Sequence, residues 1–288
     1  MARKLFCQWG PWAYRISQEK EILRRKMKDL SQGPFVKTFQ KEPLPQLIYD
    51  HKSLILRRLG DVDMALQQNK RVNLTLAAPR VDGILIYPGE TFSFWHLVGR
   101  CTRRKGYQTG MTIGKGQVGQ GVGGGMCQFT NLIHFMVLHS PLTILEHHHH
   151  DSMDLFPDFG RQVPFGVGTS IAYNYLDYRV RNDTQQVFQL KTFIDGEYLH
   201  GQLRCQEPLP YCWHIRVEDE YFEKEGAELY RHNTIYRRKV DKKTGNYEDT
   251  VLMHNRARVL YDHSYVPQSA IRQQEEERKE KSKCSSIQ

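Results

Sequence analysis

The chain has 288 residues, of which 39% are hydrophobic and 25% charged, a composition typical of an ordinary globular protein with one or two domains. Its six cysteines are irregularly spaced and form no Cys-X-X-Cys pair, which argues against a zinc ribbon and against a disulfide framework. The formal charge of +9 favours acidic partners, but the basic residues are dispersed, so we expect no nucleic-acid binding.

No stretch has the apolar length of a secretory signal or of a transmembrane helix, so we expect a cytoplasmic protein. Residues 5–14 are rich in aromatic side chains. Such a segment either packs on the body of the protein or lies at a membrane interface, and peripheral membrane association is therefore an alternative expectation.

The first predicted elements are two helices and a strand. Apolar residues recur at helical spacing over 16–30, and a second helix is predicted from near 61 to 78. The short apolar run 83–87 is typical of a buried strand. A helix over 126–138 is apolar on most sides, which predicts that it is buried. Residues 143–146 then predict a strand.

Two hairpins are predicted in the second half of the chain. Partial alternation and the turn signal Asn182-Asp183 predict that 171–181 pairs with 187–194. The sequence around 241–246 predicts a second hairpin, joining 234–240 to 247–253.

These elements predict an α+β fold, in which a glycine loop and a buried helix pack on an antiparallel sheet built from residues 142–200. The expected organisation is an N-terminal helical region (1–64), a core domain (65–200), a β-rich C-terminal extension (201–266) and a charged, disordered tail (267–288).

The glycine-rich stretch that ends in Cys127 is the strongest functional signal. The next residues predict a helix, which places the Cys127 sulfur at a helix N-terminus, where backbone N–H groups favour the thiolate. Such a thiolate is suited to acyl transfer. Gly123, Gly124 and Gly125 permit close backbone approach, and we expect their backbone to support the oxyanion.

The histidine tract that follows supplies a candidate base. In an extended chain His148 and His150 point to the same side, and Glu146 or Asp151 would orient the imidazole. Two other interpretations stay open: a zinc ion held by Cys127 and these two histidines, and a polar surface patch.

Four further residues are candidate substrate-binding residues. Gln128 either helps to form the oxyanion hole or caps the helix, and Glu90 is either a turn residue or a partner of the site. Asp177 and Arg179 share one face of a predicted strand, and Arg179 could bind a substrate carboxylate, although a solvated strand face is the alternative.

Four motifs in this order carry a resemblance to a known family: Pro88-Gly-Glu-Thr-Phe-Ser93, Gly121-Val-Gly-Gly-Gly-Met-Cys-Gln128, the histidines after Glu146, and Asp177-Tyr-Arg-Val-Arg-Asn182. Over roughly residues 65–200 the chain resembles the VanW family. The sequence departs from many members at Val167-Gly168, where they carry Arg-Asp, and at His149, which replaces the proline of a His-Pro-His element.

The resemblance implies a bacterial cell-wall context and a gene set for glycopeptide resistance. It also implies L,D-transpeptidase chemistry on peptidoglycan stem peptides or their precursors, with Cys127 as nucleophile, the His-Pro-His element at His148 and His150, and no cofactor. The alternatives are a non-catalytic accessory protein that binds a cell-wall precursor or another resistance protein, and a zinc-dependent hydrolase.

Overall fold

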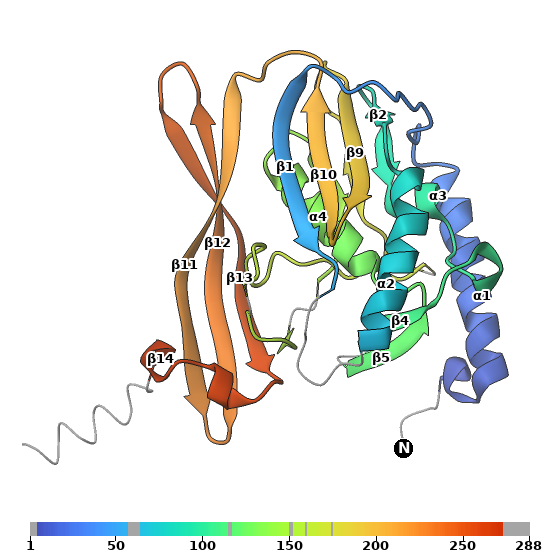
Figure 1. The fold of residues 1–288 in the computed structure, drawn as a ribbon, viewed down its shortest axis with the longest axis vertical. Coiled ribbons are helices and arrows are strands. Elements are labelled where there is room, and N and C mark those ends of the chain that lie inside the picture. Colours follow the sequence, from blue (N-terminus) through green and yellow to red (C-terminus); the bar gives the residue numbers. More distant parts are fainter. Residues whose placement is uncertain are drawn as a thin grey trace, which may run out of the picture.

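The computed structural model confirms an α+β fold of several antiparallel sheets and four α-helices in the part of the chain that it describes (Figure 1). The described residues are 5–56, 64–114, 117–149, 152–158, 160–173 and 175–272. Among them, no helix is long and apolar enough to cross a membrane.

A four-stranded antiparallel sheet forms the centre of the molecule. Its strands, in spatial order, are β1 (Gln46–Leu54), β10 (Tyr198–Cys205), β9 (Phe188–Asp195) and β2 (Ile84–Ile86). The segment 1–64, expected to be helical, therefore also contributes a strand to the core sheet. The expected domain boundary at 200/201 falls inside β10.

The helix α4 (Met126–Leu138) packs against this sheet, and ten of its thirteen residues are buried, as the sequence predicted. The contact with β10 is close. A Cβ on Gly201 would lie 2.7 Å from Leu132 and 2.6 Å from Met136 of the helix. The supporting sheet differs from the expected one, because β1 and β2 come from outside residues 142–200.

The predicted hairpin over 171–194 is wrong. The strand β8 (Arg179–Arg181) lies in a separate three-stranded sheet, between β3 (Thr91–Ser93) and β6 (Thr143–Glu146), whereas β9 belongs to the central sheet. The buried Asn182 explains the divergence. Its amide donates to the carbonyl oxygens of Ile86 and Gln186 and accepts from the Thr184 N–H, which holds an open connection in place of a tight turn.

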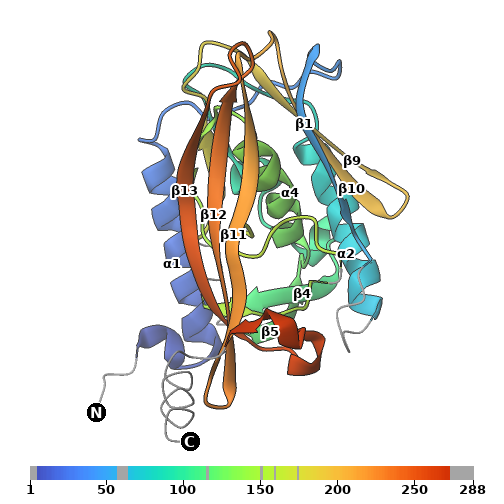
Figure 2. The ribbon, with the colours of Figure 1, turned by 90° about the vertical axis from the view of Figure 1, so that its left-hand side faces the viewer.

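A sheet of long strands makes up the C-terminal part. Its order is β14 (Ile271–Arg272), β11 (Tyr211–Glu225), β12 (Glu228–Asp241), β13 (Tyr247–Val259) and β7 (Met153–Asp154). The hairpin predicted at 241–246 is confirmed by the antiparallel pairing of β12 with β13. Figure 2 shows α4 behind these strands, where Phe135 and Leu138 pack with Val167 and Ile235.

The remaining described elements complete the fold. They are α1 (Pro11–Asp29), α2 (Met64–Ala77), the short helix α3 (Phe94–Val98), the hairpin of β4 (Thr109–Gly114) and β5 (Gln117–Val122), and single 3-10 turns at Phe6–Gln8, Ala78–Arg80, Arg103–Lys105, His263–Tyr265 and Gln268–Ala270. The helix α1 lies at the outer edge of the molecule (Figure 1). Most of the tail expected to be disordered, residues 273–288, lies outside the described residues.

Candidate functional site

Cys127 occupies the first turn of α4, as the sequence predicted. The helix begins after Gly125, and its first intrahelical hydrogen bond runs from the Phe129 N–H to the Gly125 carbonyl at 3.3 Å. The N–H groups of Met126 and Gln128 consequently have no carbonyl partner within the helix. Unpaired N–H groups beside a sulfur atom are suited to binding an oxyanion.

The three glycines before the helix have a structural reason in the fold itself. A Cβ on Gly124 would lie 2.5 Å from the Met111 carbonyl oxygen of β4, so only glycine fits there. Gly125 has a φ of 107°, and its Cβ would lie 2.5 Å from Lys70 Cγ. The close approach inferred from the sequence is thus an approach to β4 and α2.

The oxyanion role expected for the glycine backbone needs one correction. The Gly123 N–H donates to the Gln108 carbonyl at 3.0 Å, so this donor is already used inside the protein. The carbonyl oxygen of Gly124 is fixed by the side-chain amide of Asn73 at 2.8 Å. The Gly123 N–H is therefore not available to a ligand, whereas the N–H groups of the first turn of α4 have no partner within the helix.

Cys127 lines a groove of about 1660 Å³ between the core and the C-terminal sheet. Gly123, Gly124 and Gly125 also line it, as does Tyr14 of α1. Pockets for drug-sized ligands measure about 300–1,000 Å³, so the groove is large enough for an extended molecule.

The predicted thiolate is wrong as a resting state. Burial raises the pKa of the Cys127 thiol above its ordinary value of 9.0, even though the backbone N–H groups of Ile171 and of Cys127 itself act in the opposite direction. Cys127 as a residue is partly buried and lines the groove. Desolvation of the charged form therefore outweighs the two hydrogen bonds that favour it.

His148 lines the same groove, and its Nε2 lies 3.1 Å from Glu146 Oε1, the pairing expected for an oriented base. No hydrogen bond joins His148 to the Cys127 thiol in this structure. His147 faces the other way and stacks on the buried His134, with ring centroids 4.2 Å apart. His150, the second histidine expected at the site, lies outside the described residues.

The described residues bear on the zinc alternative in one respect. Among them, no three His, Cys, Asp or Glu side chains come together in a way that could hold a metal ion. Cys127 and His148 are described, whereas the third expected ligand, His150, is not.

Gln128 lines the groove, but its side chain is engaged by β1. Its Nε2 donates to Ser53 Oγ at 2.8 Å and to the Leu54 carbonyl at 2.9 Å. Glu90 lies in the turn after β2, where Oε2 accepts from the Tyr87 N–H at 3.1 Å. Gln128 thus ties α4 to the central sheet, and Glu90 has the geometry of a turn residue away from the groove.

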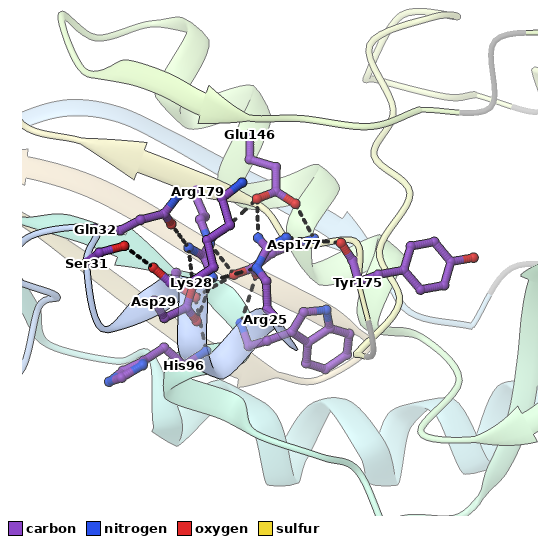
Figure 3. A network of polar contacts seen from close by, with 12 residues as sticks. Arg25, Lys28, Asp29, Ser31, Gln32, His96, Glu146, Tyr175, Asp177 and Arg179 are labelled. Carbon is purple, nitrogen blue, oxygen red and sulfur yellow. Dashed lines mark hydrogen bonds and ion pairs between the residues drawn. The ribbon is translucent and has the colours of Figure 1, made fainter. Parts of the chain in front are cut away.

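Asp177 and Arg179 lie outside the groove, in a buried polar network (Figure 3). Asp177 accepts four hydrogen bonds: from Ser93 Oγ, from the N–H groups of Trp95 and Tyr178, and from Arg179 Nε.

Arg179 carries this network to α1. Its guanidinium also bonds Asp29 at 2.8 Å and Gln32 at 2.5 Å, which attaches the end of α1 to β8. It lines a second cavity of about 550 Å³ that also contacts Glu146 and His148. The structure therefore separates these two residues from Cys127, and their polar groups are bonded within the protein.

Sequence patterns alone did not identify several residues of the site. Lys70 and Asn73, both buried on α2, support the glycine loop, and Asn131 Oδ1 accepts from the Thr169 N–H at 2.6 Å beside the groove. Thr169 Oγ1 in turn donates to the Cys127 carbonyl at 3.3 Å. A signal existed for α2, because two polar residues interrupt the face that carries the buried Leu74 and Ala77.

Fold and site together define an α+β protein with a cysteine at the N-terminus of a buried helix, open to a long groove. The VanW-like protein family matches residues 69–204. The vancomycin B-type resistance protein VanW of Enterococcus faecalis is 32% identical over 228 residues, covering 79% of this chain and 82% of that protein. This chain therefore belongs to the VanW family.

A second relative matches a shorter stretch. YoaR of Bacillus subtilis is 33% identical over 117 residues, which is 40% of this chain and 36% of that protein. No solved structure matches the chain.

Proposed function

We propose that this protein is a glycopeptide-resistance accessory protein that carries out cysteine-dependent acyl transfer on peptidoglycan stem peptides or their precursors. The observation that carries the proposal is that Cys127 lines a large groove from the first turn of α4, with backbone N–H groups directed at its sulfur. The similarity to a protein named for vancomycin resistance supports the cell-wall context.

The raised pKa of Cys127 specifies how such a reaction would begin. Because the resting group is a thiol, a base has to take its proton as the sulfur attacks, as in serine enzymes. In the proposed mechanism the imidazole of His148 or His150 is this base. Glu146, bonded to His148, holds the His148 ring and stabilises the imidazolium.

The remaining steps form a thioester on Cys127 and then resolve it. Sulfur adds to the carbonyl carbon of the amide. The oxyanion that forms accepts hydrogen bonds from N–H groups in the first turn of α4. The C–N bond then breaks, and the amine leaves with the proton from the imidazolium, which gives a thioester on Cys127. A second amine or water attacks this thioester, and the thiol is regenerated.

The size and lining of the groove support a peptide substrate. At about 1660 Å³ it exceeds what a single sugar or amino acid needs. Its lining includes the cations Lys52, Lys70 and Arg161 and the carboxylates Asp154 and Asp158. Groups of both signs suit a stem peptide, which carries both amino and carboxylate groups.

The test is intact-mass detection of a covalent adduct after incubation with a stem peptide or with a carbapenem. We expect an adduct that is lost in Cys127→Ala and retained in Cys101→Ala, a matched control because Cys101 lines the same groove. Full wall-modifying activity in Cys127→Ala would rule the proposal out.

The raised pKa also favours a second candidate, a non-catalytic protein that binds a cell-wall precursor or another resistance protein in the groove. In that case Cys127→Ala retains its affinity for the stem peptide, measured by calorimetry, and retains the resistance phenotype. Loss of the phenotype with unchanged affinity would contradict this candidate and favour catalysis.

A further inference from the structure

Five large apolar side chains of α1 and its C-cap are exposed, whereas Ala13 is buried and Ile22 is half-buried. Between 54% and 89% of each of the five is exposed. They are Trp12, Ile16, Leu23, Met27 and the C-cap Leu30, called here the outer face of α1. At 3.6 residues per turn, they fall within an arc of about 60°.

The opposite side of α1 attaches the helix to the protein, and it does so through charges. Arg25 pairs with Glu146, and Asp29 pairs with Arg179 at 2.8 Å. Glu19 lies at the edge of the outer face, where it forms an exposed ion pair with Arg100 at 2.5 Å. Ala13 is the only residue of the helix that is fully buried. A helix of a globular protein normally turns its apolar stripe to the core and its charges to water, and α1 has the reverse arrangement.

Aromatic side chains extend the outer face beyond the start of the helix. Phe6 packs edge-to-face on Trp9 and Trp12, with centroid distances of 5.4 Å and 5.6 Å, and all three are exposed. Exposed tryptophans beside an apolar stripe are typical of helices that lie in the interface of a membrane.

Basic residues flank the outer face. Between residues 11 and 30 the chain has six basic and three acidic side chains, and the whole chain carries +9. Arg15, Lys20, Arg24 and Lys26 are exposed. Two of the three acids, Glu19 and Asp29, are neutralised by arginines of the body. A second copy of this helix would place these cations against one another, whereas anionic lipids complement them.

We propose that the outer face of α1, together with Phe6 and Trp9, docks this protein on an anionic lipid bilayer. The helix lies flat at the level of the headgroups, with its apolar arc in the acyl boundary and its cations at the phosphates. Figures 1 and 2 both show α1 at the periphery, where no other described element covers it. Tyr14 and Gln18 of α1 line the large groove, so docking brings the edge of this groove close to the bilayer.

The experiment is co-sedimentation of the full chain with vesicles of phosphatidylglycerol and phosphatidylcholine, and with vesicles of phosphatidylcholine alone. We expect binding to the anionic vesicles, with a blue shift in the fluorescence of Trp9 and Trp12. The double substitution Leu23→Gln with Met27→Gln removes two largely exposed apolar groups, and lowers the partition coefficient by about 100-fold. Lys20→Gln and Lys26→Gln each lower it about fivefold.

The matched control is Leu47→Gln with Leu260→Gln, which alters two exposed leucines away from α1 and leaves binding unchanged. Circular dichroism checks that each variant is folded. The proposal is overturned if the wild type ignores anionic vesicles, or if the Leu23/Met27 variant binds as the wild type does. Concentration-dependent self-association that this variant abolishes would also overturn it, in favour of a second copy as the occupant.

Discussion

The clearest quantitative expectation concerns the reactivity of Cys127. Burial raises its pKa above 9.0, so less than about 1% of the thiol is ionised at neutral pH. A charge at a helix N-terminus gains about 0.3–1 kcal/mol, which is less than one pKa unit at 1.36 kcal/mol per unit. Alkylation by iodoacetamide at neutral pH should therefore be about 100-fold or more slower than at full ionisation.

The assay follows the alkylation of each cysteine-containing peptide by mass spectrometry from neutral to strongly alkaline pH. The rate at Cys127 should keep rising past pH 9.0. Cys101 is the internal reference, because burial raises its pKa to about 11 despite a hydrogen bond with Tyr107. An inflection near or below neutrality at Cys127 would refute the reasoning, since it would mean that the helix field dominates desolvation.

Three further expectations concern stability. Arg179→Met leaves Asp177 buried without its cation and should lower the free energy of unfolding in urea by about 3 kcal/mol; a loss under about 1 kcal/mol would contradict a buried network. Gly124→Ala should cost about 1–3 kcal/mol by the same measurement, because a Cβ meets the Met111 carbonyl at 2.5 Å, whereas Gly119→Ala, with only ordinary contacts, should be neutral. Burial opposes the charge of Glu146, but Arg25 and the Asp177 N–H prevail and lower its pKa below 4.5. The stability this gives is present above pH 4.5 and is lost as pH falls through the folded pKa, so Glu146→Gln should flatten the acid limb of a denaturation profile, and an unchanged limb would count against the ion pair.

The elements with strong local signals were predicted well. The helix α4 was recognised because nine of its thirteen residues are apolar and lie on most of its sides, β6 was predicted with its observed bounds, and the turn at 241–246 specified its own hairpin. The start of α1 was placed five residues late, since Pro11 favours the first helical turn and the predicted helix began at Ile16.

Pairing between distant segments could not be read from local patterns. No local pattern in residues 46–54 indicates that they pair with 198–205. The signal at Asn182 predicted a tight turn, whereas its buried side-chain amide holds an open connection. The same limit affects the site. Asp177 and Arg179 alternate as an exposed strand would, yet a helix 150 residues away provides Arg179 with its partner Asp29.

The sequence by itself determined that Cys127 stands at the start of a buried helix after three glycines, because helix periodicity and glycine placement are local properties. Only the tertiary structure decided the charge of that sulfur and which side of α1 meets water. Desolvation depends on every atom packed around a group, and the exposed side of a helix depends on what the rest of the chain offers it, here the carboxylate of Glu146 and the guanidinium of Arg179 in place of an apolar surface.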